Sequence, residues 1–397
     1  MSERELPRNP AGRDDPADYA VDTAAEAPGA ALAATSAGGE RRRPARWGAI
    51  AWSRRNGRSL LWTSLILVPA ALAAALLDMS DVTVFLVSVV ALIPLAWVIG
   101  EATEQAGEYT GPAIAGLLNA SFGNAPELMI ALFAVANGLF DVVRGSLSGS
   151  VISNLLLVLG FSLFVGGRGR IARRSAYGAL GMVALAGLLF ALPTIAHGWS
   201  AHEQLTAIGV GVAVVLLAIY VVVTVRSVVQ ESRRHRENGG GSGGAGWSLP
   251  RALITLGLAT LATVAVTEVL VDSIEAFTRA SGLSELFVSA VIVAIAGNAA
   301  EHGGALVIAA RGGVRLASEI ALQSASQVAV GVIPAVVLLS LAIRPMPLFF
   351  SWVEYLGLAV AILVPASLLV RGRSARWHGT SMVAAYAAVV FAFYTVM

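Results

Sequence analysis

From about residue 60 to its end, the chain alternates long apolar stretches with short polar breaks. Most of the stretches have the roughly 20 residues that an α-helix needs to cross a bilayer. They lack the period-two alternation of the strands of a membrane β-barrel. The pattern predicts an all-α integral membrane protein with about eleven transmembrane helices, at residues 60–79, 82–100, 110–138, 145–166, 176–197, 204–226, 252–272, 283–310, 316–342, 349–370 and 376–396.

The composition agrees with this fold class. Of the 397 residues, 56% are hydrophobic and only 13% are charged, whereas roughly 25% are charged in a typical soluble domain. A soluble fold of this length cannot hide so much apolar surface, which excludes an ordinary soluble enzyme, a disordered chain and a nucleic-acid-binding protein. The chain has no cysteine, which excludes disulfides and thiolate metal sites.

The arginines are distributed unevenly over the polar breaks. If the N-terminus is cytoplasmic and each span reverses the chain, the arginine-rich breaks all fall on the cytoplasmic side, as the positive-inside rule requires. The breaks on the other side contain only Arg144, Arg279 and Arg344. The distribution predicts a multi-pass protein of the cell (inner) membrane, with its N-terminus in the cytoplasm and its C-terminus outside.

Two polar segments divide the chain. Residues 1–57 contain no apolar signal-peptide core and predict a disordered cytoplasmic tail. Residues 227–250 end in a glycine-rich run and predict a flexible cytoplasmic linker. The remainder is then a leading transmembrane helix at 58–81, a first five-helix repeat at 82–226 and a second five-helix repeat at 251–397.

The two predicted repeats share a motif. Gly-Asn-Ala-Pro-Glu at 123–127 and Gly-Asn-Ala-Ala-Glu at 297–301 lie 174 residues apart. Because each repeat has an odd number of spans, the second repeat enters the membrane with the opposite orientation. This is the inverted-topology architecture of many secondary transporters, whose binding site lies near the midplane between the repeats.

Each motif places one glutamate, Glu127 or Glu301, deep inside an apolar stretch. A carboxylate at such a depth costs at least about 2.5–3.5 kcal/mol. Neither predicted span contains an arginine that could neutralise it. The pair therefore indicates a site that binds a metal cation or protons, and the alternative is that both acids are permanently protonated and hydrogen-bonded to neighbouring helices.

Other polar residues accompany the two glutamates. Asn124 and Asn298 precede them by three residues and so share a helix face with them. Carboxylate, amide and hydroxyl oxygens together suit calcium, which takes 6–8 oxygen ligands. We expect Gly123, Gly297 and Pro126 to open the helix backbone, although tight packing and interhelical hydrogen bonds would also explain these residue types. The spans at 145–166 and 316–342 add Ser150, Ser153, Asn154, Ser324 and Gln327.

Several further ionisable residues lie in or beside the spans. The acids could attract cations toward the centre or carry protons, and His302 could relay protons. Solvated helix ends and a hydrogen-bonded helix histidine are the alternatives. The candidate access-path acids are Glu101, Glu275 and Glu319, with Glu104, Glu268 and Glu354 as weaker ones.

These motifs resemble the calcium/cation antiporter superfamily, and in particular its calcium/proton exchanger branch. The resemblance rests on 123–127, on GSLSGSVISNLLLVLGFSLFVGG at 145–167, on GNAAEH at 297–302 and on QSASQ at 323–327, and it extends over roughly 58–397. It implies one extra leading span, two inverted five-span repeats, and transport of Ca2+ against H+ by alternating access. Carried over to this chain, the acids that bind metal cation or protons are Glu127 and Glu301, assisted by Asn124, Asn298, Ser150, Ser324 and Gln327, with Ser153 and Asn154 as weaker members.

The chain departs from the family pattern in three places. Its N-terminal 57 residues have no counterpart in the family. Its linker at 227–250 is rich in arginine and glycine, whereas the family often has an acidic helix there. Gln323 stands where the family usually has a glycine. Any calcium effect of an acidic loop is therefore in doubt, and packing near Gln323 is expected to differ.

The sequence leaves more than one function open. The first hypothesis is a Ca2+/H+ antiporter whose central glutamates hold either one Ca2+ or protons, and which needs no soluble cofactor. The alternative is an Na+ or K+ antiporter, coupled to protons or to calcium, on the same fold. A cation channel is less favoured because channels usually build their filter at a symmetric subunit interface, and a membrane enzyme is disfavoured because no nucleophile–base pair is apparent. The sequence does not determine the oligomeric state.

Overall fold

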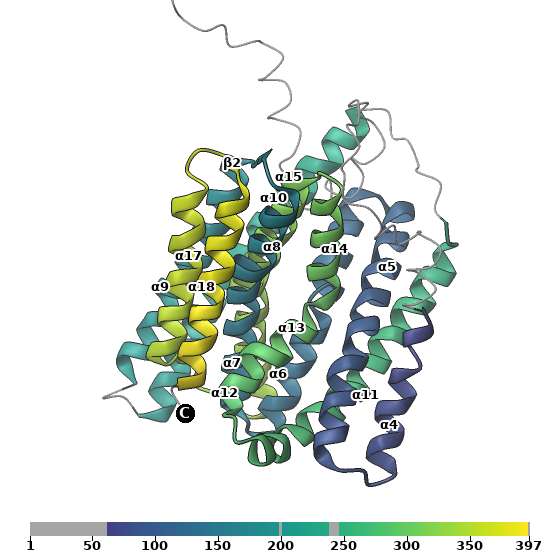
Figure 1. The fold of residues 1–397 in the computed structure, drawn as a ribbon, viewed down its shortest axis with the longest axis vertical. Helices are drawn as coiled ribbons and strands as arrows, with labels where there is room; N and C mark the ends of the chain where they lie inside the picture. Colours follow the sequence, from purple (N-terminus) through teal and green to yellow (C-terminus); the bar gives the residue numbers. More distant parts are fainter. Residues whose placement is uncertain (1–61, 198–200, 238–245, 396–397) are drawn as a thin grey trace, which may run out of the picture.

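The computed structural model describes residues 62–197, 201–237 and 246–395. The predicted tail at 1–57 lies outside these residues, as do residues 238–245 of the predicted linker. Within the described residues the fold is a bundle of helices with one two-stranded sheet (Figure 1). The sheet lies at one end of the bundle, and the chain passes α12 and its C-terminus at the opposite end.

The first half of the bundle contains eight helical elements and a short strand. They are α4 (Leu67–Leu76), α5 (Asp81–Phe122), α6 (Ala125–Asn137), α7 (Phe140–Ile152), the π-helix η2 (Ser153–Val158), α8 (Leu159–Gly166), β1 (Gly169–Arg170), α9 (Arg173–Ala196) and α10 (His202–Glu237).

The second half has a similar order of elements. They are α11 (Leu249–Ser281), α12 (Glu285–Phe287), the π-helix η3 (Val288–Val293), α13 (Ala294–Gly297), α14 (Ala299–Ala310), α15 (Val314–Gln327), the π-helix η4 (Val328–Val332), α16 (Ile333–Ile343), α17 (Trp352–Leu368), β2 (Arg373–Ser374) and α18 (Arg376–Thr395).

Membrane-spanning helices are the dominant feature of the described residues, as predicted, but fewer of them are complete spans. Six helices are long and apolar enough to cross a bilayer, and a seventh span is possible if the bent pair at 285–310 counts as one. Three further apolar helices have only 10–17 residues, including Ala125–Asn137. The remaining predicted spans fall on these shorter helices, on the bent pair and on α18 (Arg376–Thr395), which has 20 residues.

The structure corrects three predicted boundaries. The leading helix, predicted at 58–81, ends at Leu76 in the described residues. The polar residues between the second and third predicted spans form no loop, because α5 continues through them to Phe122. The first part of the predicted linker, residues 227–237, is helical and belongs to α10. In the second and third cases, polar side chains lie on a helix that extends past the apolar stretch.

Equivalent elements of the two halves begin about 174 residues apart. This offset relates the start of α6 to that of α14 and the start of α7 to that of α15. In Figure 1 the chain passes from α7 to α8 away from the C-terminal end of the bundle, whereas α15 begins at the far end and runs back. The equivalent helices are therefore antiparallel, as an inverted repeat requires.

The two halves interlock at the centre, where α7 packs against η3. A Cβ atom at Gly149 would lie 2.1 Å from the backbone oxygen of Ala290, and one at Gly145 would lie 2.1 Å from Oγ of Ser289. Only glycine allows the two backbones to approach so closely, which is the small-residue packing typical of membrane helices. This contact joins the serine-rich helix of the first half to the helix that leads to Glu301.

Candidate cation-binding site

Two broken helices place the motif glutamates at the centre of the bundle. The chain turns at Gly123 and Asn124 between α5 and α6, and α12–α13 meets α14 at a bend of 60° next to Asn298. Asn124 has φ −101° and ψ 19°, and Asn298 has φ −91° and ψ 9°. The two asparagines thus interrupt their helices with nearly the same backbone conformation, outside the helical region.

Each glutamate lies in the first turn of the half-helix that follows the break. Glu127 is the third residue of α6, and Glu301 is the third residue of α14. Free backbone N–H groups and the positive end of the helix dipole favour negative charge at such a position. Pro126 is tolerated in this first turn because its missing N–H would have had no partner within the helix. The helices are interrupted at Gly123–Asn124 and at Asn298, and Pro126 and Gly297 are the helical residues beside these breaks.

The glutamates of the two halves approach each other. A Cβ atom at Gly297 would lie 3.7 Å from Cδ of Glu127, so the first carboxyl group lies against the break that precedes Glu301. The two carboxyl groups are close enough to interact electrostatically. Glu127 is only 4% exposed, and Glu301 is half-buried. Two acids therefore face one central region, and Glu301 is the more accessible of them.

Amide and hydroxyl side chains connect the helices around these carboxyl groups. The amide nitrogen of Asn154 donates to Oδ1 of Asn298 (3.2 Å) and to Oγ of Ser324 (3.0 Å). The amide nitrogen of Asn298 donates to Oγ of Ser150 (2.9 Å). Asn154 is fully buried and links η2 to both α14 and α15. The sequence ranked it among the weaker candidates, yet it bonds two other predicted site residues, as Asn298 does.

A second pair of amide side chains also connects the two halves of the chain. Asn124 donates from its amide nitrogen to Oε1 of Gln327 (3.2 Å), joining the first break to α15. Ser324 interacts with the carboxyl group of Glu301. Ser153 instead donates to the backbone oxygen of Ser150 (3.2 Å), which is a bond within its own helix. The structure thus brings together the predicted site residues from both repeats, with Ser153 contributing mainly to local helix structure.

Several buried oxygens of this region accept no hydrogen bond in the described residues. They are Oδ1 of Asn124, Oε2 of Glu127, Oδ1 of Asn154 and Oε2 of Glu301. A buried oxygen without a donor is costly, and carboxylate and amide oxygens of this kind are the ligands that a hard cation prefers. No group of three His, Asp or Glu side chains that could hold a metal occurs in the described part of the chain. Neutral oxygens must therefore supplement the two carboxylates, and the residues present fit such a site.

The candidate access-path acids lie away from this centre. Glu275 is exposed and pairs with Arg279 (3.2 Å), and Glu319 pairs with Arg315 (3.3 Å). Glu101 is half-buried on α5. The exposed pair of Glu275 agrees with a solvated helix end, which was the alternative for that residue, whereas Glu319 is partly buried and paired within α15.

Glu354, a weaker candidate, has a structural role. It is fully buried, receives the backbone N–H of Ser351 at 2.7 Å, and forms a capping box with Ser351 at the start of α17. It also contacts the hydroxyl of Ser148 at 3.2 Å. This arrangement ties α17 to α7, and the serine three residues before Glu354 was the sequence signal for it.

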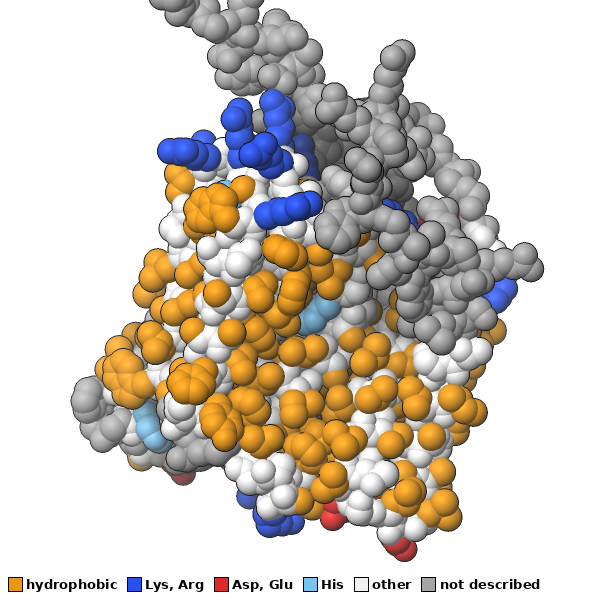
Figure 2. All heavy atoms as spheres, viewed as in Figure 1, with side chains coloured by type: hydrophobic (Ala, Val, Ile, Leu, Met, Phe, Trp, Pro, Cys, Tyr) orange, Lys and Arg blue, Asp and Glu red, His pale blue; other side chains and the backbone are white. Residues whose placement is uncertain are grey.

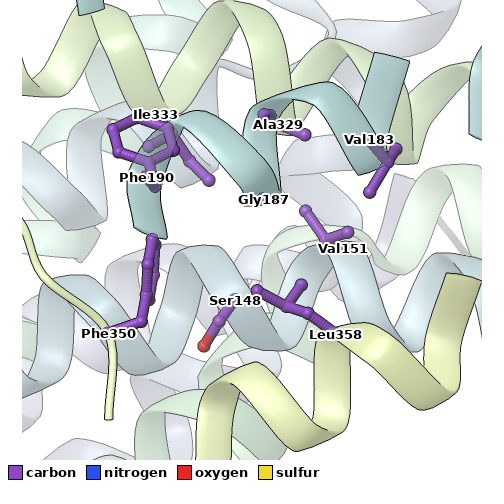
Figure 3. A pocket seen from close by; sticks show the side chains of 10 residues that line it. Ser148, Val151, Val183, Gly187, Phe190, Ala329, Ile333, Phe350 and Leu358 are labelled. Atoms are coloured by element: carbon purple, nitrogen blue, oxygen red, sulfur yellow. The ribbon is translucent and has the colours of Figure 1, made fainter. Parts of the chain in front are cut away.

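A cavity between helices of both halves is distinct from the glutamate site. It lies among α7, α9, α16 and α17 and is lined almost entirely by apolar side chains, including Val151, Phe190 and Phe350 (Figure 3). Ser148 provides its polar atom. Because it contains no carboxylate, this cavity offers no ligand set for a metal cation.

A family model and several known proteins are similar to this chain over most of its length. A family model described as "Sodium/calcium exchanger protein" matches residues 80–229 and 251–395. The chain is 32% identical over 366 residues to a Ca2+/H+ antiporter of Aphanothece halophytica, covering 85% of this chain and 97% of the relative. It is 34% identical over 339 residues to the Ca2+/H+ antiporter ChaA of Bacillus subtilis, covering 82% and 96%.

Solved structures show the same architecture. The structure of native YfkE superposes with a TM-score of 0.73 at 31% identity, covering 84% of this chain and 99% of the other. The H+/Ca2+ exchanger CAX superposes with a TM-score of 0.67 at 13% identity, covering 85% and 91%, and at this identity the likeness concerns the fold alone. The all-α membrane fold predicted from the sequence is confirmed.

Proposed function

Because the chain belongs to the sodium/calcium exchanger protein family, we propose that it is a secondary active transporter that exchanges Ca2+ for H+. Its relatives named as Ca2+/H+ antiporters align over most of both chains. The same names support calcium/proton exchange over the Na+ or K+ alternative. Ca2+ and H+ are then substrates of the protein.

One observation carries this proposal. Glu127 and Glu301 lie at equivalent positions of inverted halves and approach each other through the helix breaks. Their Oε2 atoms, with the free amide oxygens of Asn124 and Asn154, form a set of oxygens without hydrogen-bond donors. Oxygen-only ligand sets select hard cations, and two carboxylates match the charge of one divalent ion.

The negative charge of the two glutamates couples the transport of Ca2+ to that of protons. Two ionised carboxylates in a dry site are penalised by desolvation and by their mutual repulsion. One Ca2+ or two protons relieve both penalties, so Glu127 and Glu301 hold one cargo or the other. The empty, doubly charged site resists the conformational change, and release of one cargo therefore requires uptake of the other.

The inverted repeats supply the conformational change. In this architecture one bundle moves against the other around a fixed central site, so that the site opens to each side in turn. Helices of the site depart from regular geometry at the breaks before Glu127 and Glu301. They also do so at η2, which contains Asn154, and at η4, which follows Gln327. We place the motion at these positions.

Proton flux in proteoliposomes tests the proposal. Purified full-length protein is reconstituted with a pH-sensitive dye inside, and Ca2+, Mg2+, Na+ and K+ are added outside in turn with the membrane potential clamped. Proton movement upon Ca2+ addition is the expected result, and movement only with Na+ or K+ would replace the substrate. Monodisperse protein that moves no protons with any of the four cations would contradict the proposal.

A further inference from the structure

Two loops from opposite halves of the chain are interlocked at one end of the bundle. The loop after α8 contains β1, and the loop between α17 and α18 contains β2, which pairs antiparallel with β1. The hydroxyl of Ser374 donates to the backbone oxygen of Gly167 at 2.8 Å, and the N–H of Ile171 donates to the oxygen of Gly372 at 2.9 Å. These bonds fix the two loops relative to each other.

The interlocked loops gather positive charge. We call the set of arginines on them the arginine patch: Arg168, Arg170, Arg173, Arg371, Arg373 and Arg376. All six are exposed, and the segments 166–177 and 369–378 contain no Asp or Glu. Figure 2 shows blue side chains gathered at this end of the molecule, above sides that are covered with hydrophobic residues.

Backbone contacts hold the members of the arginine patch close together. Arg170 lies directly opposite Arg373 in the strand pair. A Cβ atom at Gly372 would meet Cγ of Arg173 at 2.6 Å, and one at Gly167 would lie 3.5 Å from Nε of Arg376. Like charges placed opposite each other destabilise a strand pair. The fold therefore concentrates cationic side chains from two distant segments of the chain in one place, where one anion can contact several of them.

Aromatic side chains mark this point as the membrane–water boundary. Trp377 is 59% exposed and Tyr177 is 38% exposed, each next to a loop of the patch. Exposed tryptophan and tyrosine are typical of the level of the lipid headgroups. Below them, α9 and α18 present apolar side chains such as Leu188, Leu192 and Phe391 outward. The arginine patch is therefore placed at the expected level of the lipid phosphate groups.

We propose that the arginine patch is a binding surface for anionic phospholipid headgroups, which stabilise the strand pair that joins the two repeats. Arginine binds phosphate bidentately through its planar fork. Basic clusters between transmembrane helices at this level bind anionic headgroups. The bound lipid bridges a loop of the first repeat and a loop of the second.

Native mass spectrometry of the purified full-length protein tests the proposal. Detergent-solubilised protein is supplied with phosphatidylglycerol or with phosphatidylcholine, and the retained lipid is counted. Arg371→Gln/Arg373→Gln removes two members of the patch. Arg226→Gln/Arg251→Gln is the matched control, because it removes two positive charges from exposed arginines on α10 and α11, outside the patch.

We expect the patch variant to bind phosphatidylglycerol roughly 20- to 30-fold more weakly than the unaltered protein, at about fivefold per arginine. The control variant and the phosphatidylcholine samples should show no such change. Equal retention in the patch and control variants would overturn the proposal, because net charge alone would then explain it.

A second measurement separates lipid from free phosphate. The thermal unfolding midpoint of unaltered protein should rise with phosphatidylglycerol and not with inorganic phosphate at the same concentration, and the rise should disappear in the patch variant. A rise with inorganic phosphate alone would assign the patch to a soluble anion and contradict a lipid surface. Because neither variant touches the glutamate site, this result is independent of the transport assay.

Discussion

At the scale of single residues, the protein is organised around two acids at the same position of two half-helices. Glu127 and Glu301 are both third residues of a helix that starts after a break. The free N–H groups of a first turn favour their ionised form, whereas burial in an apolar bundle disfavours it. This balance allows a carboxylate to exchange a proton for a metal cation, which a permanently neutral or permanently charged group cannot do.

We predict that Glu127→Gln and Glu301→Gln each abolish exchange while the protein still folds. Glutamine keeps the size and the oxygen but removes the charge, so the site can no longer balance Ca2+ or hold a proton. Ca2+-dependent proton flux in proteoliposomes measures the loss, and a monodisperse size-exclusion profile verifies the fold.

Glu275→Gln is the matched control for these variants. Glu275 is exposed and paired with Arg279, and an exposed pair contributes little. Its exchange should remain within about twofold of the unaltered protein. Full exchange by either central variant would refute the assignment of Glu127 and Glu301 to the site.

At the scale of elements, close packing between the repeats depends on residues that carry no functional group. Gly149 lets α7 touch the backbone of η3 at Ala290. The neighbouring Ser150 is then in place to accept the amide of Asn298. The contact between α7 and η3 therefore positions an oxygen of the site through backbone geometry alone.

We predict that Gly149→Ala destabilises the protein by about 3 kcal/mol or prevents its folding. The new methyl group would lie 2.1 Å from the oxygen of Ala290, and overpacking of a dense core typically costs about 1–3 kcal/mol. The thermal unfolding midpoint in detergent measures this effect.

Gly178→Ala provides the comparison. A Cβ atom at Gly178, on α9, would have no neighbour within 4 Å. Alanine is also the better helix former, by about 0.8–1 kcal/mol. This variant should unfold at the same temperature or slightly higher, and an equal loss of stability in both variants would contradict the packing argument.

At the scale of the whole molecule, the two ends of the helix bundle differ in charge, and the sides between them are covered with hydrophobic side chains (Figure 2). The strand pair and most of the loop arginines lie at one end, while α12 and the C-terminal end of α18 lie at the other (Figures 1 and 2). The hydrophobic side chains between the two ends form the kind of surface that contacts the lipid of a bilayer (Figure 2). We propose that the arginine-rich end faces the cytoplasm, following the positive-inside rule.

Cysteine labelling measures this orientation without background, because the chain has no native cysteine. We predict that Ser80→Cys and Ser281→Cys react with an impermeant maleimide added to whole cells. Both side chains are exposed, at the end opposite the strand pair. Arg168→Cys, in the loop with β1, should react only after the cells are opened, and the reverse pattern would invert the topology.

Some features of this protein follow from the sequence alone. Hydropathy determines that the fold is a helical membrane bundle. In lipid, a single chain segment can hydrogen-bond all its backbone N–H and C=O groups internally when it forms a helix. The repeat of Gly-Asn-Ala-Pro-Glu as Gly-Asn-Ala-Ala-Glu identifies both central acids, because a carboxylate is too costly inside a bilayer without a function. Each signal is contained in short segments of the chain, so it can be detected in the sequence without knowledge of the tertiary structure.

Only the tertiary structure decided how these parts meet. Hydropathy could not show that α5 continues through its polar segment, that α10 extends to Glu237, or that the third predicted span is broken. Nor could it reveal that Asn154 bridges Asn298 and Ser324 or that Glu354 contacts Ser148. Such bonds join residues that lie far apart in the chain or depend on the precise direction of a helix end, and their partners are chosen by packing rather than by local sequence.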